Sequence, residues 1–384
     1  MVMDIAKAVG KLEYVDVLAT DTRGEAFEHD GVRFLKRSAW VYLGNFFSCL
    51  PVAFIFSLRK RYAMTYGTFI RFVYYWLMTG YLKKVLSCAK YDIVHIHGCG
   101  FGTELWIQVC KKLDQQFVVT LHGLDSFSET VRLESAGKQY ERDFLKRATK
   151  GEIPITVIST GMKKLIEKTY NTSDCNNITV VCNSFKFDEE NDSDFDVRTH
   201  YEIPMSSKVL LYVGNISHNK NQEQMVRSYA LLPEEIQKST YVLFCGADHM
   251  KDGILQKLIE NSPNKSHLVL CGVVDKDRMV YYYKEANGVV LLSYTEGFGL
   301  SLVEGMHFGL PCVMHKDLDA FEDIYNECAV VTADGRDDNN VANAIVTLLT
   351  NDWNIDFIKA YSKKFESESM AQKYFDVYHK IVKG

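Results

Sequence analysis

The chain of 384 residues lacks the sequence patterns of proteins stabilised by disulfides or structural metal ions, and those of fibrous proteins. Its ten cysteines form no C-x-x-C pair, which argues against a zinc ribbon or a thioredoxin-type site. Six prolines and 24 glycines exclude collagen-like and proline-rich classes. No segment of about 20–50 residues is repeated, which excludes solenoids and propellers. The first residues carry Asp4, Lys7 and Lys11 within a helical pattern, so we do not expect them to act as a signal peptide.

A strong charge of one sign is also absent. The chain has 44 Lys and Arg against 49 Asp and Glu, a net charge of -5. Because there is no basic excess, we expect no nucleic-acid partner. Hydrophobic residues make up 47% and charged residues 24%, which is a globular composition too long for one ordinary domain. Several cysteines lie within apolar runs, which indicates reduced core thiols and a cytoplasmic location.

Two alternations of apolar strand-like runs with helical patterns predict two domains. Such alternation implies parallel sheets with helices on both faces, that is, two Rossmann-like, doubly wound α/β domains with a cleft between them. We expect an N-terminal domain at residues 1–185, an acidic linker at 186–206, a second domain at 207–362, and a C-terminal helix at 363–384 that crosses back to the first domain. The predicted strands are residues 91–97, 117–122, 155–159, 178–183, 208–214, 240–246, 267–272, 288–293, 311–314 and 328–331.

Residues 39–58 form a run of twenty residues without a charge, with Arg and Lys on both sides. Gly44, Asn45, Ser48 and Pro51 interrupt this run, and residues 69–86 that follow are aromatic and basic. Three interpretations stay open: a buried helical layer, a surface that seats on a membrane, or a span. We expect a peripheral contact with the inner face of the membrane through residues 33–84.

The most informative segment runs from the apolar strand that ends at Ser293 into a helix that starts near Leu300. Gly297 and Gly299 lie in the tight loop between them. A strand, a glycine loop and a helix N-terminus make an anion site, because unpaired backbone N–H groups point at the ligand. Glu296 and Glu304 flank this site. We expect both carboxylates to face one pocket and to accept hydrogen bonds from sugar hydroxyls.

These residues resemble the E-x7-E signature of retaining, nucleotide-sugar-dependent glycosyltransferases of family 4. Residues 309–311, Gly-Leu-Pro, fit the same pattern. The resemblance implies the GT-B fold, in which the active site lies between two Rossmann-like domains. Further resembling segments are residues 92–95, His122, Ser159, Asn183, the phosphate loop 214–221, and residues 272–274.

The resemblance also implies roles for individual residues. It assigns reaction-centre roles to Glu296, Lys220 and His122. It assigns donor-binding roles to Glu304, Gly297, Phe298, Gly299, Leu300, Ser301, Gly214, Asn215 and Val273. The donor would be a nucleoside diphosphate sugar, and no metal or other cofactor is expected, because Lys220 and the helix N-terminus supply the positive field.

The chain departs from the family pattern at two places. Asn215 stands where the family has an arginine, which removes half of the expected cationic clamp. Family members begin with a strand and a glycine-rich loop, whereas this sequence begins at the helix that follows. We therefore expect either an open reading frame that starts roughly 15–20 residues upstream or a weakly active protein.

Three functions stay open after these observations. The leading hypothesis is a hexosyltransferase that acts on a glycan or lipid-linked acceptor in cell-surface polysaccharide synthesis. The alternatives are a non-catalytic, nucleotide-sugar-binding subunit and a sugar-nucleotide epimerase of the same fold. Weaker signals are a glycine-rich loop at residues 98–102 that is not G-x-G-x-x-G, an acidic run at Asp192, Asp194 and Asp196, and alternating His95 and His97 without an evident third metal ligand.

Overall fold

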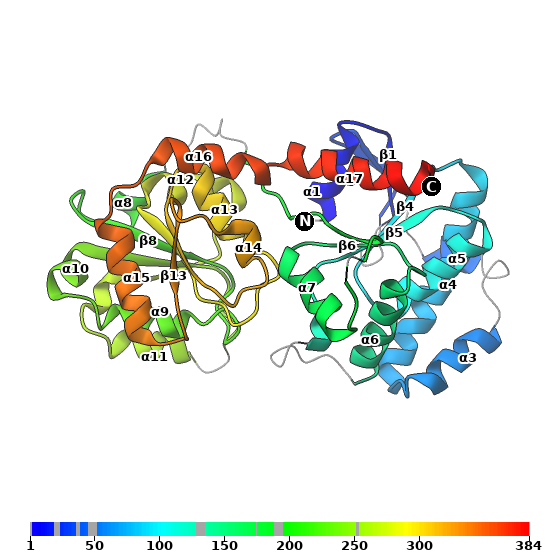
Figure 1. Cartoon of the computed structure of the whole chain (residues 1–384), viewed down its shortest axis with the longest axis horizontal. Coiled ribbons are helices and arrows are strands. Elements are labelled where there is room, and N and C mark those ends of the chain that lie inside the picture. Colours follow the sequence, from blue (N-terminus) through cyan, green and yellow to red (C-terminus); the bar gives the residue numbers. More distant parts are fainter. Residues whose placement is uncertain are drawn as a thin grey trace. The chain divides into compact units, whose positions relative to one another are not determined.

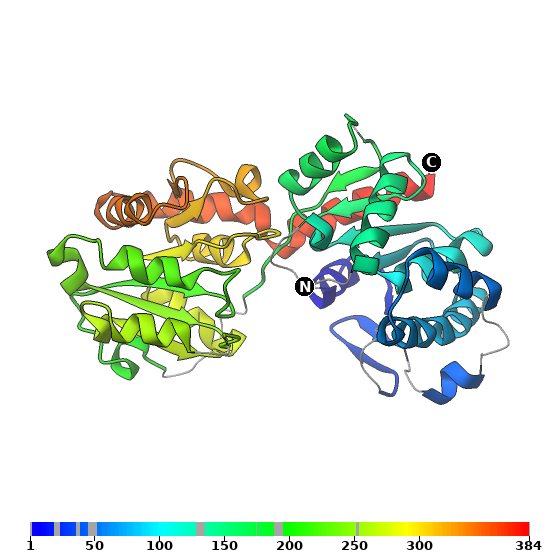
Figure 2. The ribbon, with the colours of Figure 1, turned by 90° about the horizontal axis from the view of Figure 1, so that it is seen from below.

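The structure, a computed structural model, describes residues 2–18, 24–35, 39–44, 52–127, 135–173, 175–187, 195–250 and 253–383. The chain divides into two compact units, which Figures 1 and 2 show in two views. Unit 1 consists of residues Met1–Cys182 and Ser367–Gly384, and unit 2 of Asn183–Glu366. The C-terminal segment therefore belongs to the same unit as the N-terminus.

The main sheet of unit 1 has four parallel strands in chain order. They are β4 (Val94–His97), β5 (Phe117–Leu121), β6 (Ile155–Val157) and β7 (Ile178–Val180). The connecting helices are α5 (Phe101–Lys112), α6 (Ser135–Thr149) and α7 (Thr160–Thr169). Every residue of β5 is buried, which explains its continuous apolar run, since a parallel strand covered on both faces does not alternate.

A small second sheet lies near the N-terminus, and its hairpin was not predicted from the sequence. Strand β1 (Val15–Val17) pairs in parallel with β3 (Val32–Phe34), and β2 (Phe27–His29) pairs with β3 in antiparallel. Asp30 and Gly31 join β2 and β3, and both have positive φ, 52° and 74°. An Asp-Gly pair of this kind forms the two-residue turn that matches the twist of a hairpin.

The described residues of the apolar and basic region of unit 1 form three helices: α2 (Ala39–Gly44), α3 (Val52–Arg61) and α4 (Tyr66–Cys88). Helix α4 begins at Thr65, whose Oγ1 accepts a hydrogen bond from the N–H of Thr68 at 3.3 Å. It packs against α5 and buries Phe72 and Trp76. Within the described ranges, no helix combines the length and the apolar character that crossing a bilayer requires.

Helix α17 (Ser367–Lys383) completes the core of unit 1 from the other end of the chain. It packs against α1 (Val2–Gly10), as Figure 1 shows. The apolar cluster between them joins residues of both helices to residues of the main sheet: Ile5, Ala8, Val9, Val118, Val181, Met370, Ala371, Tyr374 and Val377. Helices α1 and α17, from opposite ends of the chain, thus share one hydrophobic core.

Unit 2 contains one sheet of six parallel strands. Along the sheet their order is β10 (Leu268–Gly272), β9 (Thr240–Cys245), β8 (Lys208–Val213), β11 (Gly288–Leu291), β12 (Cys312–His315) and β13 (Val330–Ala333). This is the doubly wound order, which reverses direction between β8 and β11. Loops after those two strands therefore meet at the topological switch point, where such sheets bind ligands.

Helices cover both faces of this sheet. Helices α9 (Gln222–Tyr229), α11 (Ile254–Glu260) and α15 (Asp338–Thr350) pack together on one face. Helices α12 (Lys276–Glu285), α13 (Leu300–His307) and α16 (Ile355–Ser362) lie on the other, where α13 contacts α16 and α12 reaches α13 through a hydrogen bond. The short elements are α8 (Val197–His200), α10 (Glu234–Ser239), α14 (Phe321–Ile324), η2 (Asp125–Phe127), η3 (Lys265–His267) and η4 (Lys363–Phe365).

All ten strands predicted from residue 91 onward are confirmed, with bounds within a few residues. In the acidic segment, Asp192 and Asp194 lie outside the described residues. Asp196 caps helix α8, because its carboxylate accepts from the N–H groups of Arg198 and Thr199. The buried Arg198 then pairs with Glu285 of α12 at 2.6 Å, so α8 packs against α12 within unit 2.

Candidate active site

Two loops at the switch point of unit 2 are joined by hydrogen bonds of Asn219. One loop follows β8 (residues 214–221) and the other follows β11 (residues 292–299). The side chain of Asn219 donates to the carbonyl of Thr295 at 2.9 Å and accepts from the N–H and hydroxyl of Thr295 at 3.2 and 2.7 Å. Its carbonyl accepts from the N–H of Tyr294 at 2.8 Å. The phosphate loop (residues 214–221) and the loop that carries Glu296 (residues 292–299, here called the glutamate loop) thus form one connected unit.

The buried phenol of Tyr212 also connects these two loops. Tyr212 lies in β8 and is fully buried. Its hydroxyl donates to the carbonyl of Lys220 and accepts from the N–H of Leu292 at 2.8 Å. Burial raises the pKa of this phenol, so it stays a neutral donor. The backbone beneath Lys220 is therefore fixed relative to the end of β11.

Lys220 of the phosphate loop and Glu296 of the glutamate loop form an ion pair. The ammonium of Lys220 donates to Oε2 of Glu296, and the hydroxyl of Ser293 reaches the same oxygen at 3.4 Å. The Lys220 stem lies along Gly214, where an added Cβ would be 3.5 Å from Lys220 Cε. The structure thus brings together three residues that the resemblance placed in one site.

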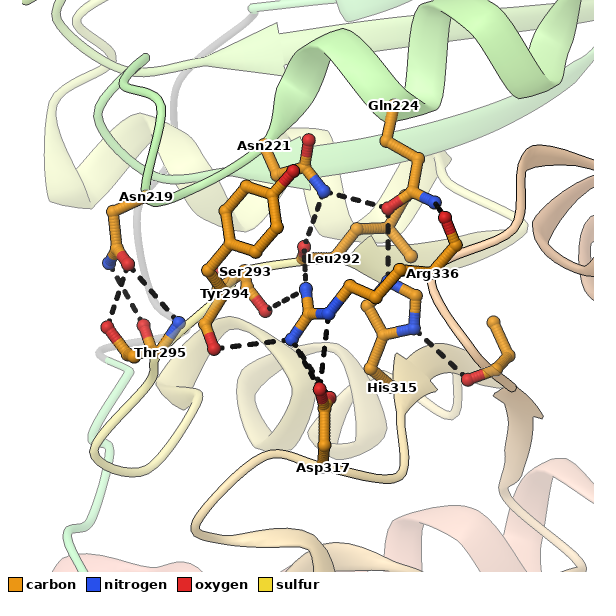
Figure 3. A network of polar contacts seen from close by, with 11 residues as sticks. Asn219, Asn221, Gln224, Leu292, Ser293, Tyr294, Thr295, His315, Asp317 and Arg336 are labelled. Atoms are coloured by element: carbon orange, nitrogen blue, oxygen red, sulfur yellow. Dashed lines mark hydrogen bonds and ion pairs between the residues drawn. The ribbon is translucent and has the colours of Figure 1, made fainter. Parts of the chain in front are cut away.

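Arg336 holds the start of the glutamate loop in place, as Figure 3 shows. Its guanidinium donates to the carbonyls of Leu292, Ser293 and Tyr294 at 3.1, 2.8 and 3.2 Å. It also forms two hydrogen bonds of 2.9 Å with the carboxylate of Asp317. Planar donors in fixed geometry suit such a fork, and a lysine would not reproduce it.

Buried amides extend this network toward the sheet (Figure 3). Gln224 donates to the carbonyl of Arg336 at 2.9 Å and accepts from Asn221 at 2.7 Å. Oε1 of Gln224 also lies 3.1 Å from Nε2 of His315, whose Nδ1 contacts the carbonyl of Ala333. Sequence reasoning missed Arg336, Asn219, Asn221, Gln224 and His315. The phosphate-loop spacing could have pointed to the two asparagines, but no local pattern marks the others.

Helix α13 begins beside the ion pair. Gly299 caps it with φ 88°, and a Cβ there would lie 3.1 Å from the side chain of Leu291. Leu300 and Ser301 follow in the first turn, where N–H groups have no acceptor within the helix. The ring of Phe298 is only 2% exposed and packs against Phe365. Phe298 can therefore contribute its backbone to a ligand, whereas its side chain belongs to the core.

A third carboxyl group lies close to Glu296. Burial, together with the nearby charges of Glu296 and Asp317, raises the pKa of Asp319 to about 6. A carboxyl group of this kind carries a proton in part of the population near neutral pH. Asp319 thus adds a second acidic group beside Glu296, the ion-pair partner of Lys220.

Glu304, predicted to share a pocket with Glu296, has a different partner. Its Oε2 accepts from the hydroxyl of Tyr283 in α12 at 2.7 Å. Tyr283 is fully buried, and desolvation together with the charge of Glu304 raises its pKa. Val273 lies on the next loop, after β10, is 73% exposed, and borders a cavity of about 130 Å³ that Tyr201 and Arg278 also line.

Three histidines gather at the ends of β4 and β5 in unit 1. Nδ1 of His97 lies 3.1 Å from Nε2 of His122, with the rings stacked, and His95 packs beside His97. Burial lowers the pKa of His97 to about 3 and that of His122 to about 4, so both rings are neutral at pH 7. Nδ1 of His122 is buried without a hydrogen-bond partner in the structure. In the described part of the chain, no three His, Cys, Asp or Glu side chains are arranged to hold a metal ion.

The loop that follows His122 is fastened to helix α6. Oε2 of Glu141 accepts from the N–H of Ser126 at 3.0 Å, and Arg142 donates to the carbonyl of the same residue at 3.1 Å. Glu141 is buried, and Oε1 has no hydrogen-bond partner in the structure. Desolvation therefore raises its pKa to about 7.

Asn215 is exposed near the start of the phosphate loop. Its carbonyl and that of Gly214 accept from the side-chain amide of Gln222 at 3.2 and 3.3 Å. Oε1 of Gln222 accepts in turn from the N–H of Ser217 at 3.3 Å. The loop thus keeps a defined conformation although the residue at position 215 carries no charge.

Comparison with known families finds a match over each half of the chain. The model described as Glycosyltransferase Family 4 matches residues 1–188, and the model described as Glycosyl transferases group 1 matches residues 194–365. The O-antigen chain mannosyltransferase B of Escherichia coli is 28% identical over 142 residues. That match covers 37% of this chain and 37% of the relative, so it spans little more than a third of either protein.

Two solved structures extend the comparison to the fold. Sucrose-phosphate synthase from Thermosynechococcus elongatus has a TM-score of 0.71 at 19% identity, over 99% of this chain and 92% of that one. An Anabaena protein in complex with UDP and glucose has a TM-score of 0.63 at 15% identity, over 78% and 81% of the two chains. These likenesses concern the arrangement of helices and strands in two Rossmann-like units.

Proposed function

Since the chain belongs to glycosyltransferase family 4 and has the GT-B fold, we propose that it transfers a hexose from a nucleoside diphosphate sugar, with retention of anomeric configuration. The acceptor is a glycan or a lipid-linked acceptor in cell-surface polysaccharide synthesis. The O-antigen relative supports this choice of acceptor. In this proposal, unit 1 contacts a membrane through residues 33–84.

The observation that carries the proposal is the ion pair of Lys220 and Glu296 at the switch point of unit 2. A nucleoside diphosphate sugar carries its diphosphate next to the hydroxyls of the sugar. A site that binds it therefore needs a cation and a helix N-terminus beside a carboxylate. The ammonium and the first N–H groups of α13 suit the diphosphate. The carboxylate of Glu296 suits the hydroxyls.

Bond cleavage places new negative charge on the diphosphate. The bond between the anomeric carbon and the diphosphate oxygen breaks, and its electron pair leaves with that oxygen. Lys220 and the N–H groups of Leu300 and Ser301 stabilise the charge, an effect of several kcal/mol in a preorganised site. The acceptor hydroxyl attacks from the same face and passes its proton to the departing oxygen, which gives retention.

The remaining predicted residues orient the donor. We assign Glu304 to the ribose hydroxyls and the backbone of Val273 to the nucleobase. We assign His122, whose buried Nδ1 has no hydrogen-bond partner in the structure, to a hydroxyl of the transferred sugar. The complex of an Anabaena relative with UDP and glucose makes a uridine nucleotide the first donor to test.

A second candidate is a non-catalytic subunit that binds a nucleotide sugar. The uncharged Asn215 favours it, because the family's arginine at this place would supply half of the cationic clamp. Such a subunit would bind the donor without turning it over. The two candidates therefore differ in turnover and agree in binding.

Thermal shift with UDP-, GDP- and ADP-sugars identifies the donor, since a bound ligand raises the melting temperature. Release of nucleoside diphosphate is then measured with and without acceptor glycans. We expect release only with acceptor, and we expect Lys220→Ala to lower kcat/KM by roughly 100-fold or more. Lys238→Ala is the matched control, because Lys238 pairs with Glu234 on helix α10 instead.

Three outcomes decide between the candidates. Acceptor-dependent release that Lys220→Ala abolishes and Lys238→Ala preserves supports the transferase. Donor binding without release under any acceptor supports the subunit. Formation of a sugar epimer without acceptor would instead identify an epimerase.

A further inference from the structure

The helices α2, α3 and α4 lie in a segment with a one-sided charge. Residues 31–91 contain no Asp or Glu, so all 49 acidic residues of the chain lie elsewhere. The same segment contains ten basic residues: Arg33, Lys36, Arg37, Arg59, Lys60, Arg61, Arg71, Lys83, Lys84 and Lys90. Burial alone does not explain this pattern, because burial removes charges of both signs.

Several of these cations lie at the surface. Lys60, Arg71 and Lys84 are exposed, and Arg59 stacks on the ring of Phe69 at 4.4 Å. Arg61 lies 3.3 Å from Asp143 of α6, so its charge is partly compensated from outside the segment. The surface of these three helices therefore has a net positive charge in a protein whose total charge is -5.

Large apolar side chains are exposed on the same helices. On α4, Tyr66 and Ile70 are 75% and 52% exposed, and with Tyr74 they recur every four residues along one face. Helix α2 exposes Trp40 to 83%, and α3 exposes Phe56. The inward face of α4 is buried against α5, so these outward side chains are not part of the core of unit 1.

Ring contacts hold the two short helices beside this face of α4. Tyr42 of α2 meets Tyr74 edge to face at 6.0 Å. Phe56 of α3 packs against Phe69 of α4 at 5.9 Å, and Figure 1 shows α3 next to one end of α4. The exposed side chains of three helices thus form one surface, which we call the basic aromatic face: Trp40, Leu43, Phe56, Lys60, Tyr66, Ile70, Arg71, Tyr74 and Lys84.

We propose that the basic aromatic face docks on an anionic lipid bilayer. Aromatic and aliphatic side chains insert at the boundary of headgroups and acyl chains, while Lys and Arg attract anionic headgroups. A nucleic acid would use the cations but offers no apolar phase for Ile70 or Leu43. The proposal specifies the membrane contact named above and does not depend on transferase activity, because binding is measured without substrate.

Flotation of the full chain with vesicles tests the proposal. The vesicles contain phosphatidylcholine alone or phosphatidylcholine with phosphatidylglycerol, at low and at high salt. We expect binding to the anionic vesicles and weaker binding as salt rises, since the attraction is screened. Absence of binding to anionic vesicles at low salt would overturn the proposal.

Charge variants show whether this face is responsible. The test variant is Lys60→Gln/Arg71→Gln/Lys84→Gln, and the control variant is Lys208→Gln/Lys257→Gln/Lys284→Gln, which removes three exposed lysines from unit 2. Each charge lost from the face is expected to lower the partition coefficient roughly fivefold. An equal loss in the control would mean that binding follows net charge, and the assignment to this face would be wrong.

Apolar variants separate a bilayer from other anionic partners. The test variant is Trp40→Ser/Ile70→Ser, and the control is Met205→Ser/Leu231→Ser, whose side chains have similar exposure in unit 2. We expect the test variant to lose roughly tenfold in vesicle binding, the effect of apolar area that no longer inserts. Undiminished vesicle binding by Trp40→Ser/Ile70→Ser would contradict insertion. Binding to RNA or DNA but not to vesicles would identify a nucleic-acid surface instead.

Discussion

Glu141 offers a test of the electrostatics of unit 1. Its buried carboxyl group accepts one hydrogen bond from Ser126, and its second oxygen has no partner in the structure. Because desolvation raises its pKa from 4.5 to about 7, the folded protein holds this proton more tightly than the unfolded chain does. The perturbation we consider is Glu141→Gln, which keeps the acceptor for Ser126 and removes the titration.

The sign and the size of the change in stability follow from the linkage between proton binding and folding. A raised pKa in the folded state stabilises the fold below pH 4.5, and this contribution is lost as the pH rises toward 7. At roughly 1.4 kcal/mol per pKa unit, the full difference is roughly 3 kcal/mol. Relative to the wild type, Glu141→Gln should therefore gain roughly 1–3 kcal/mol in the free energy of unfolding between pH 5 and pH 8.

Guanidinium unfolding followed by tryptophan fluorescence measures this difference. Trp40, Trp76 and Trp106 lie in unit 1, and Trp353→Phe removes the fourth tryptophan, which lies in unit 2. Comparing variant with wild type at each pH cancels the opposite contribution of the buried histidines. Glu13→Gln, at an exposed site of unit 1, is the control. A difference between Glu141→Gln and wild type that stays constant from pH 5 to pH 8 would refute the reasoning.

Four further outcomes follow from the site. Glu304→Ala should weaken nucleotide binding by roughly 1.5–3 kcal/mol in calorimetry, and an unchanged affinity would remove its assigned role. Activity should survive EDTA, whereas complete loss that manganese restores would overturn metal independence. His97→Phe should lower kcat and alter its pH dependence through His122, with partial rescue by His97→Asn, while a change in melting temperature alone would mean a structural role. Arg336→Lys should cost roughly 2 kcal/mol of stability and weaken donor binding, because the fork to three carbonyls and Asp317 is lost; equal affinity would argue against positioning of the glutamate loop.

The strands of the two main sheets could be predicted because each is a short apolar run bounded by turn residues. A parallel strand that is covered on both faces appears in the sequence as an unbroken, mainly apolar run, as residues 117–121 do. Such a run can be recognised without knowing which strands lie beside it. The hairpin of β2 and β3 was missed because three-residue strands carry almost no periodicity. Its Asp30-Gly31 turn was the available signal.

The site was predictable where its residues lie in one loop. Glu296, Gly299 and Leu300 are close in sequence, so their proximity follows from a strand, a turn and a helix. The contact of Lys220 with Glu296 depends on the strand order, which places β8 beside β11. Arg336 was not predictable, because it acts on carbonyls more than forty residues away, and only the packed fold brings these groups together.

The return of helix α17 to unit 1 has a consequence for synthesis on the ribosome. Unit 2 is one uninterrupted stretch, Asn183–Glu366, whereas unit 1 needs residues from both ends of the chain. When the N-terminal half has left the ribosome, Ile5 and Val9 still lack Tyr374 and the rest of α17. Domains fold as units during translation, so the domain that is made second is the first whose chain is complete. The apolar cluster around Ile5 and Val9 in the nascent N-terminal half thus stays incomplete until residues 367–383 have been made and pack against it.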